Sequence, residues 1–152
     1  MSVPQGNEAL KNEAWYAFMQ MKELLGSRLE QQLQATSNLS NADFTVLVVL
    51  SESPGRRCRL FELGRTIGWE KSRLHHQLTR MSQRGLVRRE SDPESVRGMY
   101  AVLTDEGFSA IVAAAPAHNR EVQRLFFDHI TEQQVKQLKV ISRRVLAELL
   151  AD

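Results

Sequence analysis

Cysteine is nearly absent from this sequence, and so are long apolar stretches. Cys58 is the single cysteine in 152 residues, so no internal disulfide can form. No segment approaches the roughly 20 consecutive apolar residues that a membrane-spanning helix requires. Residues 1–15 contain no basic region followed by an apolar core, which argues against a secretory signal. We therefore expect a cytoplasmic protein without membrane attachment, because a lone cysteine fits a reducing compartment.

The sequence motifs of common catalytic and metal sites are also missing. There is no GxSxG, HExxH or glycine-rich phosphate loop, and no cysteine and histidine at a useful spacing. His75 and His76 are adjacent, so on a helix they point in different directions, and His118 and His129 are remote from them. We therefore expect no enzymatic activity, no metal ion and no cofactor.

Positive charge is concentrated in the middle of the chain. Residues 56–90 contain ten Lys and Arg against three acidic residues, a net charge of +7, whereas the whole chain carries +2. The remainder must therefore carry −5. Such a concentration suits a surface that binds phosphates, although a solvated arginine-rich face has the same composition.

The hydrophobic pattern predicts a mainly helical chain with one β-hairpin. Apolar residues recur at spacings of three and four along residues 8–35 and near the C-terminus, which is typical of long amphipathic helices. Ser40 and Thr131 each begin a capping-box pattern, and Thr104 is a candidate N-cap. A helix from Thr104 is expected to be interrupted at Pro116. The predicted order is four helices, two strands and two further helices.

Two helices in the middle of the chain have the proportions of a helix-turn-helix. Residues 59–67 form a short helix, Gly68 and Trp69 break it, and residues 70–84 form a second helix. The second helix has one narrow apolar stripe, Leu74–Leu78–Met81, and is polar elsewhere. Such a helix can be held on the domain by its stripe while its polar face enters a DNA major groove.

A hairpin directly after this pair indicates a winged variant. Two short strand-like runs, LVRRES and MYAVL, flank a turn-rich segment over residues 92–98. An arginine in that loop can reach an adjacent minor groove, where a narrow electronegative slot favours guanidinium.

Residues 57–108 resemble the core of the MarR family of winged-helix regulators. The similarity begins with the short helix that ends at Ile67-Gly68 and the second helix that begins at Glu70-Lys71-Ser72. It continues with the sequence RGLVRR after the second helix and a wing loop that begins at Asp92. It ends with the pattern LT-x-x-G after the wing, at Leu103, Thr104 and Gly107. One feature departs from the pattern: the usual Asp-Arg pair of the wing falls at Ser95-Val96, and only Arg97 with Gly98 is retained.

The resemblance implies a fold and a mode of action. The fold would be mainly α, with a winged helix-turn-helix over residues 39–109, a two-stranded wing, and a dimerisation region built from residues 1–38 and 110–152. The protein would act as a homodimer on a palindromic DNA operator and would regulate transcription in a sequence-specific way, more often as a repressor than as an activator.

Candidate DNA contacts follow from position on the second helix and from charge. Residues expected to contact base edges are Ser72, Arg73, His75 and His76. Residues expected to contact phosphates or the minor groove are Arg56, Arg57, Lys71, Thr79, Arg80 and Arg97.

Two further expectations concern regulation. Members of this family often bind small anionic phenolic compounds between the dimerisation helices and the DNA-binding lobe. The residues that could line such a pocket here are Trp15, Phe18, Met19, Phe44 and Val48, although simple core packing explains each of them as well. Cys58 lies among Arg56, Arg57 and Arg59, which could lower its pKa and suit a redox sensor. A redox-sensing regulator therefore stays an alternative, as does a module of the same fold that binds DNA non-specifically or binds proteins.

Overall fold

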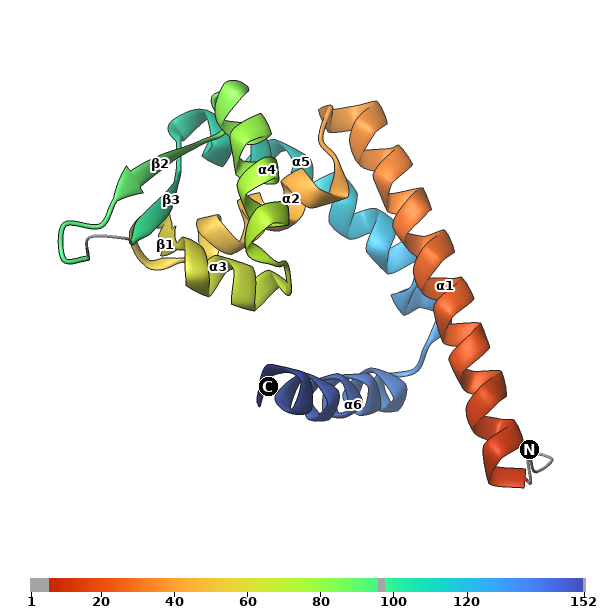
Figure 1. Cartoon of the computed structure of the whole chain (residues 1–152). Helices are drawn as coiled ribbons and strands as arrows, with labels where there is room; N and C mark the ends of the chain where they lie inside the picture. The colour runs from red at the N-terminus through yellow and green to blue at the C-terminus, as the bar shows by residue number, and fades with distance from the viewer. Residues whose placement is uncertain (1–5, 96–97, 152) are drawn as a thin grey trace.

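The computed structural model describes residues 6–95 and 98–151, and it confirms a mainly helical winged fold (Figure 1). Arg97, the predicted wing contact, lies outside the described residues. The elements in chain order are α1 (Gly6–Ser37), α2 (Asn41–Glu52), the 3-10 turn η1 (Pro54–Arg56), β1 (Arg57–Arg59), α3 (Leu60–Ile67), α4 (Lys71–Gln83), β2 (Val87–Ser91), β3 (Met99–Leu103), α5 (Asp105–Leu125), the 3-10 turn η2 (Phe127–His129) and α6 (Glu132–Ala151).

The helix-turn-helix consists of α3 and α4. Gly68 ends α3 in the left-handed conformation (φ 85°), and its N–H donates to the carbonyl of Gly64. Glycine suits this position because a Cβ is strained at positive φ. Glu70 is the N-cap of α4, whose first helical residue is Lys71. The predicted break at Gly68-Trp69 is therefore confirmed.

The wing is a three-stranded antiparallel sheet in the order β1-β3-β2, with one strand more than the sequence predicted. β1 is only the segment Arg-Cys-Arg, which has no apolar alternation to mark a strand, and we expected Arg59 to begin a helix. Cys58 pairs with Ala101 of β3, and Ala101 pairs with Arg89 of β2. These three residues therefore lie in one row across the sheet.

The core joins the helix-turn-helix to the sheet and to α5. The predicted stripe of α4 is buried and meets leucines of the helices before it and the inner residues of the sheet. Fully buried members include Leu33, Leu47, Leu50, Leu63, Leu78 and Met81. The buried face of α4 is thus fixed, and its opposite face is free.

α1 extends away from this lobe, whereas α6 turns back so that its C-terminal end approaches α3 (Figure 1). α1 and α5 pack against each other, and α5 runs unbroken through the exposed Pro116. The expected interruption at that proline is wrong, because a helix can lose one hydrogen bond on an exposed face while its buried face holds it. The predicted domain boundary at 109/110 falls inside α5, and the domain division stays a prediction. No helix within residues 6–95 and 98–151 is both long enough and apolar enough to cross a bilayer.

Candidate nucleic-acid interface

The free face of α4 carries the predicted base-contacting residues. Ser72, Arg73 and His76 are exposed, and His75 is half-buried. They lie in the first two turns of the helix and off its buried stripe. The structure therefore brings these four residues together on one surface.

Arg73 is held beside an aromatic ring. Its guanidinium carbon lies 4.5 Å from the centroid of the Trp69 ring, a cation–π distance. Trp69 itself is half-buried at the turn between α3 and α4. In this conformation the planar fork of Arg73 is presented at the start of α4, where it can pair with the O6 and N7 acceptors of a guanine.

A second arginine, which the sequence reading missed as a site residue, reaches α4 from the sheet. Arg89 Nη1 lies 3.2 Å from Nδ1 of His75, and Arg89 Nη2 donates to the Thr79 hydroxyl at 2.8 Å. The Thr79 hydroxyl in turn donates to the carbonyl of His75 at 2.9 Å. The signal available in the sequence was the alternation of β2, which places Arg89 on the side of the sheet that faces α4.

The predicted phosphate contacts fall into two groups. Lys71, Thr79 and Arg80 lie exposed on α4. Arg57 instead extends over the outer face of the sheet, 4.0 Å from the Tyr100 ring centroid and 3.7 Å from Glu90 Oε2. The structure does not bring these two groups together.

Arg56 lies with neither group. Its guanidinium is 3.5 Å from the centroid of the Phe108 ring, at the start of α5. It precedes β1 in a turn with positive φ (54°), so its position depends on the turn geometry as well as on the aromatic contact.

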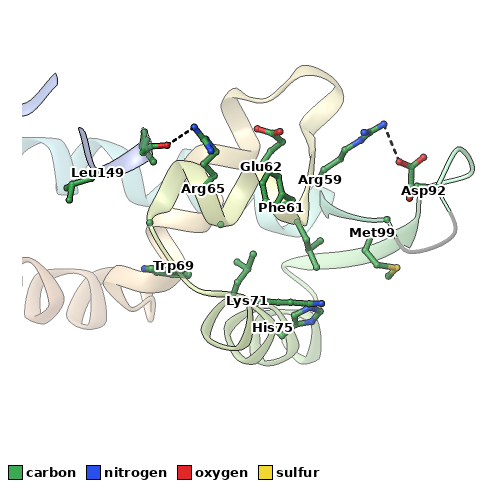
Figure 2. A pocket seen from close by; sticks show the side chains of 17 residues that line it. Arg59, Phe61, Glu62, Arg65, Trp69, Lys71, His75, Asp92, Met99 and Leu149 are labelled. Carbon is green, nitrogen blue, oxygen red and sulfur yellow. Dashed lines mark hydrogen bonds and ion pairs between the residues drawn. The ribbon is translucent and has the colours of Figure 1, made fainter. Parts of the chain in front are cut away.

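The base of the wing is tied by an ion pair. Asp92 is buried, and its Oδ2 lies 3.2 Å from Nη2 of Arg59 in β1 (Figure 2). Asp92 Oδ1 also accepts the backbone N–H of Glu94, and the N–H of Asp92 donates to the carbonyl of Gly98. The start of the wing loop is therefore ordered by β1, the strand that the sequence did not predict.

A buried carboxylate holds α4 in place from the side opposite to its exposed face. Asp43 in α2 is 5% exposed. Its Oδ1 accepts from Gln77 Nε2 at 2.6 Å and its Oδ2 accepts from Arg84 Nη1 at 2.8 Å, so α4 and the residue after it are both tied to α2. Arg80 extends this hydrogen-bond network by donating to Gln77 Oε1 at 2.8 Å. The helix that bears the candidate base contacts is therefore fixed by polar bonds as well as by its apolar stripe.

Two of the five predicted effector residues line a cavity. A hollow of about 390 Å³ lies between α1, α2 and α5, with Phe44 and Val48 in its wall. Trp15 and Phe18 are 59% and 45% exposed on α1, and Met19 is a half-buried neighbour of Phe18; none of these three lines the hollow. The wall is completed by Leu29, Asn41, Thr45, Val49 and His118.

His118 also lines this cavity, although no pattern in the sequence predicted a role for it. Its ring centroid lies 4.0 Å from that of Phe44. Its Nδ1 is buried and has no hydrogen-bond partner among the described residues. Burial lowers the pKa of His118 below that of a free imidazole, so its neutral form is favoured.

A larger hollow of about 1000 Å³ separates the helix-turn-helix from the end of α6 (Figure 2). Its walls include Trp69, Lys71 and His75, and it is bridged where Arg65 Nη2 donates to the carbonyl of Leu150 at 3.2 Å. The C-terminal helix thus contacts α3 of the helix-turn-helix.

Cys58 does not have the environment expected of a redox sensor. It is half-buried in β1, and burial raises the pKa of its thiol. The Glu62 carboxylate raises that pKa further. The expected lowering by the neighbouring arginines is therefore wrong, and a thiolate is disfavoured.

Comparisons with known proteins agree with this geometry. A family model described as MarR family matches residues 37–98. The transcriptional regulator HosA of Escherichia coli O111:H- is 32% identical over 109 residues, which cover 71% of this chain and 76% of that protein. The similarity to this regulator is therefore longer than residues 57–108, the segment that carried the resemblance in the sequence.

Two solved structures from Streptomyces coelicolor match nearly the whole chain. Sco3205, a MarR family transcriptional regulator in complex with DNA, is 36% identical with a TM-score of 0.87, over 95% of this chain and 89% of that one. AbsC, a MarR family transcriptional regulator, is 34% identical with a TM-score of 0.90, over 100% of both chains. With this identity over almost its full length, the chain belongs to the MarR family of DNA-binding transcriptional regulators.

Proposed function

We propose that this protein is a homodimeric, sequence-specific repressor that acts in the cytoplasm on a palindromic operator. The observation that supports this most is the free face of α4, where Ser72, Arg73, His75 and His76 project from a helix that is fixed from behind by its apolar stripe and by Asp43. A helix held in this way can enter a major groove without losing its orientation. Occupation of a promoter by such a protein excludes polymerase, which is the simplest route to repression.

Dimerisation is supported by apolar surface on the long helices. α1 and α6 expose large side chains that the single chain leaves uncovered, and these include Trp15, Phe18, Leu24, Ile141, Val145 and Leu149. Soluble monomers rarely expose so many large apolar residues on two of their helices. A second copy related by a two-fold axis would cover both helices at once, and its two α4 helices would then meet two half-sites.

Effector binding is supported by the cavity beside Phe44. Its aromatic and aliphatic wall suits a small aromatic ring, while Asn41, Thr45 and the unpartnered Nδ1 of His118 offer hydrogen bonds to a hydroxyl. The cavity lies between α5, which continues into the dimerisation region, and α2, which holds α4 through Asp43. A ligand that fitted better in one arrangement of these helices would change the spacing of the two α4 helices and release DNA.

Selection of bound DNA from a random pool tests the central claim. We expect an inverted repeat whose half-sites are separated by about one helical turn or a multiple of it. Arg73→Ala should then cost about 1–3 kcal/mol at the selected site and relax one base position. Lys71→Ala is the matched control, because it removes one charge from the helix entrance and should weaken selected and scrambled duplexes alike.

The competing interpretation is a module that binds DNA without sequence preference, or that binds a protein. It predicts equal affinity for selected and scrambled duplexes at one salt concentration, or no DNA affinity at all. Sedimentation at micromolar concentration tests the assembly, and a monomer would overturn the dimeric operator model.

A further inference from the structure

Arg89 and His75 form a pair whose chemistry settles which imidazole nitrogen carries a proton. The inference drawn from them rests on the proposed base contacts of α4 and makes one of them specific. Arg89 lies in the row of the sheet that contains the buried Ala101, on the side facing α4. Its neighbour Arg88 points to the other side and pairs with Glu90 at 2.9 Å. Of these two arginines, Arg89 therefore reaches α4, the helix proposed to enter the major groove and hereafter called the recognition helix.

The contact between the two side chains has only one possible direction. A guanidinium has five N–H donors and no acceptor. At 3.2 Å from Arg89 Nη1, the Nδ1 atom of His75 must therefore be the acceptor, and it carries no proton. In a neutral imidazole the proton then resides on Nε2.

Thr79 makes the arrangement self-consistent. The Thr79 hydroxyl donates its proton to the His75 carbonyl, so its oxygen is free to accept a hydrogen bond from Arg89 Nη2. Arg89 thus bridges His75 and Thr79 on one face of α4, one turn apart. The Thr79 hydroxyl is then not available to donate to a phosphate, whereas the remaining N–H groups of Arg89 are.

We infer that Arg89 is a positioning residue that fixes His75 as an Nε2–H donor toward DNA. In the major groove, guanine presents O6 and N7 acceptors, adenine presents N7 and thymine presents O4, whereas cytosine presents only its N4 amino donor. A donor that cannot change tautomer meets an acceptor on the first three bases and another donor on cytosine. The base position that His75 contacts therefore rejects cytosine on the contacted strand.

The first test is spectroscopic and uses the full-length protein without DNA. Long-range proton–nitrogen correlation spectra distinguish protonated from unprotonated imidazole nitrogens. We expect a protonated Nε2 and an unprotonated Nδ1 for His75 in the wild type, and a measurable population of the Nδ1–H tautomer in Arg89→Gln. The matched control is Arg88→Gln, which removes the same charge from the other side of β2 and should leave the His75 spectrum unchanged. A protonated Nδ1 in the wild type, or no difference between the two variants, would overturn the inference.

The second test is specificity. Selection with Arg89→Gln should reduce the discrimination against cytosine at one position of each half-site by about tenfold, within the range of a single base contact. His75→Ala should relax the same position, and the double variant should relax it no further. Arg88→Gln should change affinity little, because Arg88 lies on the outer face of the sheet beside Glu90, and it should retain the wild-type base preference. If Arg89→Gln retains it too, the positioning role is wrong.

Different results would overturn the proposed function and the Arg89–His75 pairing. If the wild-type protein selects no sequence from the pool, the proposed function is overturned, and the tautomer in the free protein still decides the Arg89–His75 pairing. If the protein selects a clear operator but tolerates cytosine at the position that His75→Ala relaxes, the proposed function stands and this inference falls.

Discussion

Gly107 in the first turn of α5 lies directly against the carbonyl oxygen of Leu86. A Cβ built on Gly107 would approach that oxygen, and also Leu103 Cδ1, far closer than the 3.0 Å that real Cβ atoms respect. The oxygen is held in place because it accepts the N–H of Thr104 at 3.2 Å, and the Thr104 hydroxyl lies between it and the Gly85 carbonyl, at 2.9 and 2.6 Å. The LT-x-x-G pattern thus has a physical reason: the N-cap threonine fixes the carbonyl that excludes any side chain at position 107.

Gly107→Ala should therefore destabilise the folded protein by about 1–3 kcal/mol or more, because neither backbone can relax without breaking the Thr104 cap. The measurement is urea denaturation followed by circular dichroism. Gly26→Ala is the matched control, since a Cβ there meets nothing within 4 Å. Within a helix that change should be neutral or stabilise by about 0.5–1 kcal/mol. Equal stability of both variants would contradict the close approach.

Asp43→Ala should destabilise the protein by about 2 kcal/mol, because it leaves the buried Gln77 amide without its acceptor. Arg84→Ala should cost less, since the Arg84 side chain is 40% exposed and its loss leaves Asp43 still bonded to Gln77 and to the N–H of Ser40. Denaturant unfolding of both variants gives the comparison. A larger loss for Arg84→Ala would mean that Asp43 is not the centre of this network.

The salt dependence of DNA binding should separate the two groups of basic residues. Lys71→Ala and Arg80→Ala remove charges from the exposed face of α4 and should each lower the log–log salt slope by about 0.9. Arg57→Ala should change the slope much less, because Arg57 lies over Tyr100 and beside Glu90 on the outer face of the sheet. Binding isotherms on one duplex at several salt concentrations test this, and a full-sized change for Arg57→Ala would place the outer face of the sheet on DNA.

The half-buried imidazole of His118 should make the folded state sensitive to acid. Its pKa in the folded protein is lowered from 6.5 by burial. As the pH falls below about 6.5, the unfolded chain binds a proton that the folded chain does not, so stability decreases with falling pH. His118→Phe keeps an aromatic ring against Phe44 and removes this proton uptake. The stability of the variant relative to wild type should therefore rise between about pH 7 and about pH 5, and a constant difference would argue against a buried neutral histidine.

The thiol of Cys58 should react slowly with alkylating agents and with peroxide. Because burial and Glu62 raise its pKa, little thiolate is present near neutral pH. Alkylation by iodoacetamide should be slower in the folded protein than in the same protein unfolded in urea, and peroxide should leave DNA binding unchanged. Rapid alkylation of the folded protein, or peroxide-induced release that Cys58→Ser abolishes, would restore the redox-sensing alternative.

The sequence was sufficient where a pattern is repeated along one element. The stripe of α4, the turn at Gly68, and the caps at Ser40 and Thr131 all follow from local spacing, and each is present in the structure. β1 was missed because a three-residue strand has too few positions to show alternation, and its identity depends on β3, which is more than 40 residues away in sequence.

The site was predictable only in part for the same reason. The exposure of Ser72, Arg73 and His76 follows from the helix period, because all three lie off the buried stripe. Arg89 and Asp43 act on α4 from other elements, at distances in sequence that no local spacing encodes. The cavity beside Phe44 likewise needs α5 to pass over α2 before His118 can complete its wall.

The position of Trp69 gives the protein an optical reporter of its own. The chain has two tryptophans, and one of them lies 4.5 Å from the guanidinium of Arg73, whose movement toward a base would change the surroundings of the indole. The other, Trp15, lies exposed on α1. In a Trp15→Phe background, emission from Trp69 would follow the start of the recognition helix without an attached dye, and titration with an operator could be recorded on unlabelled protein.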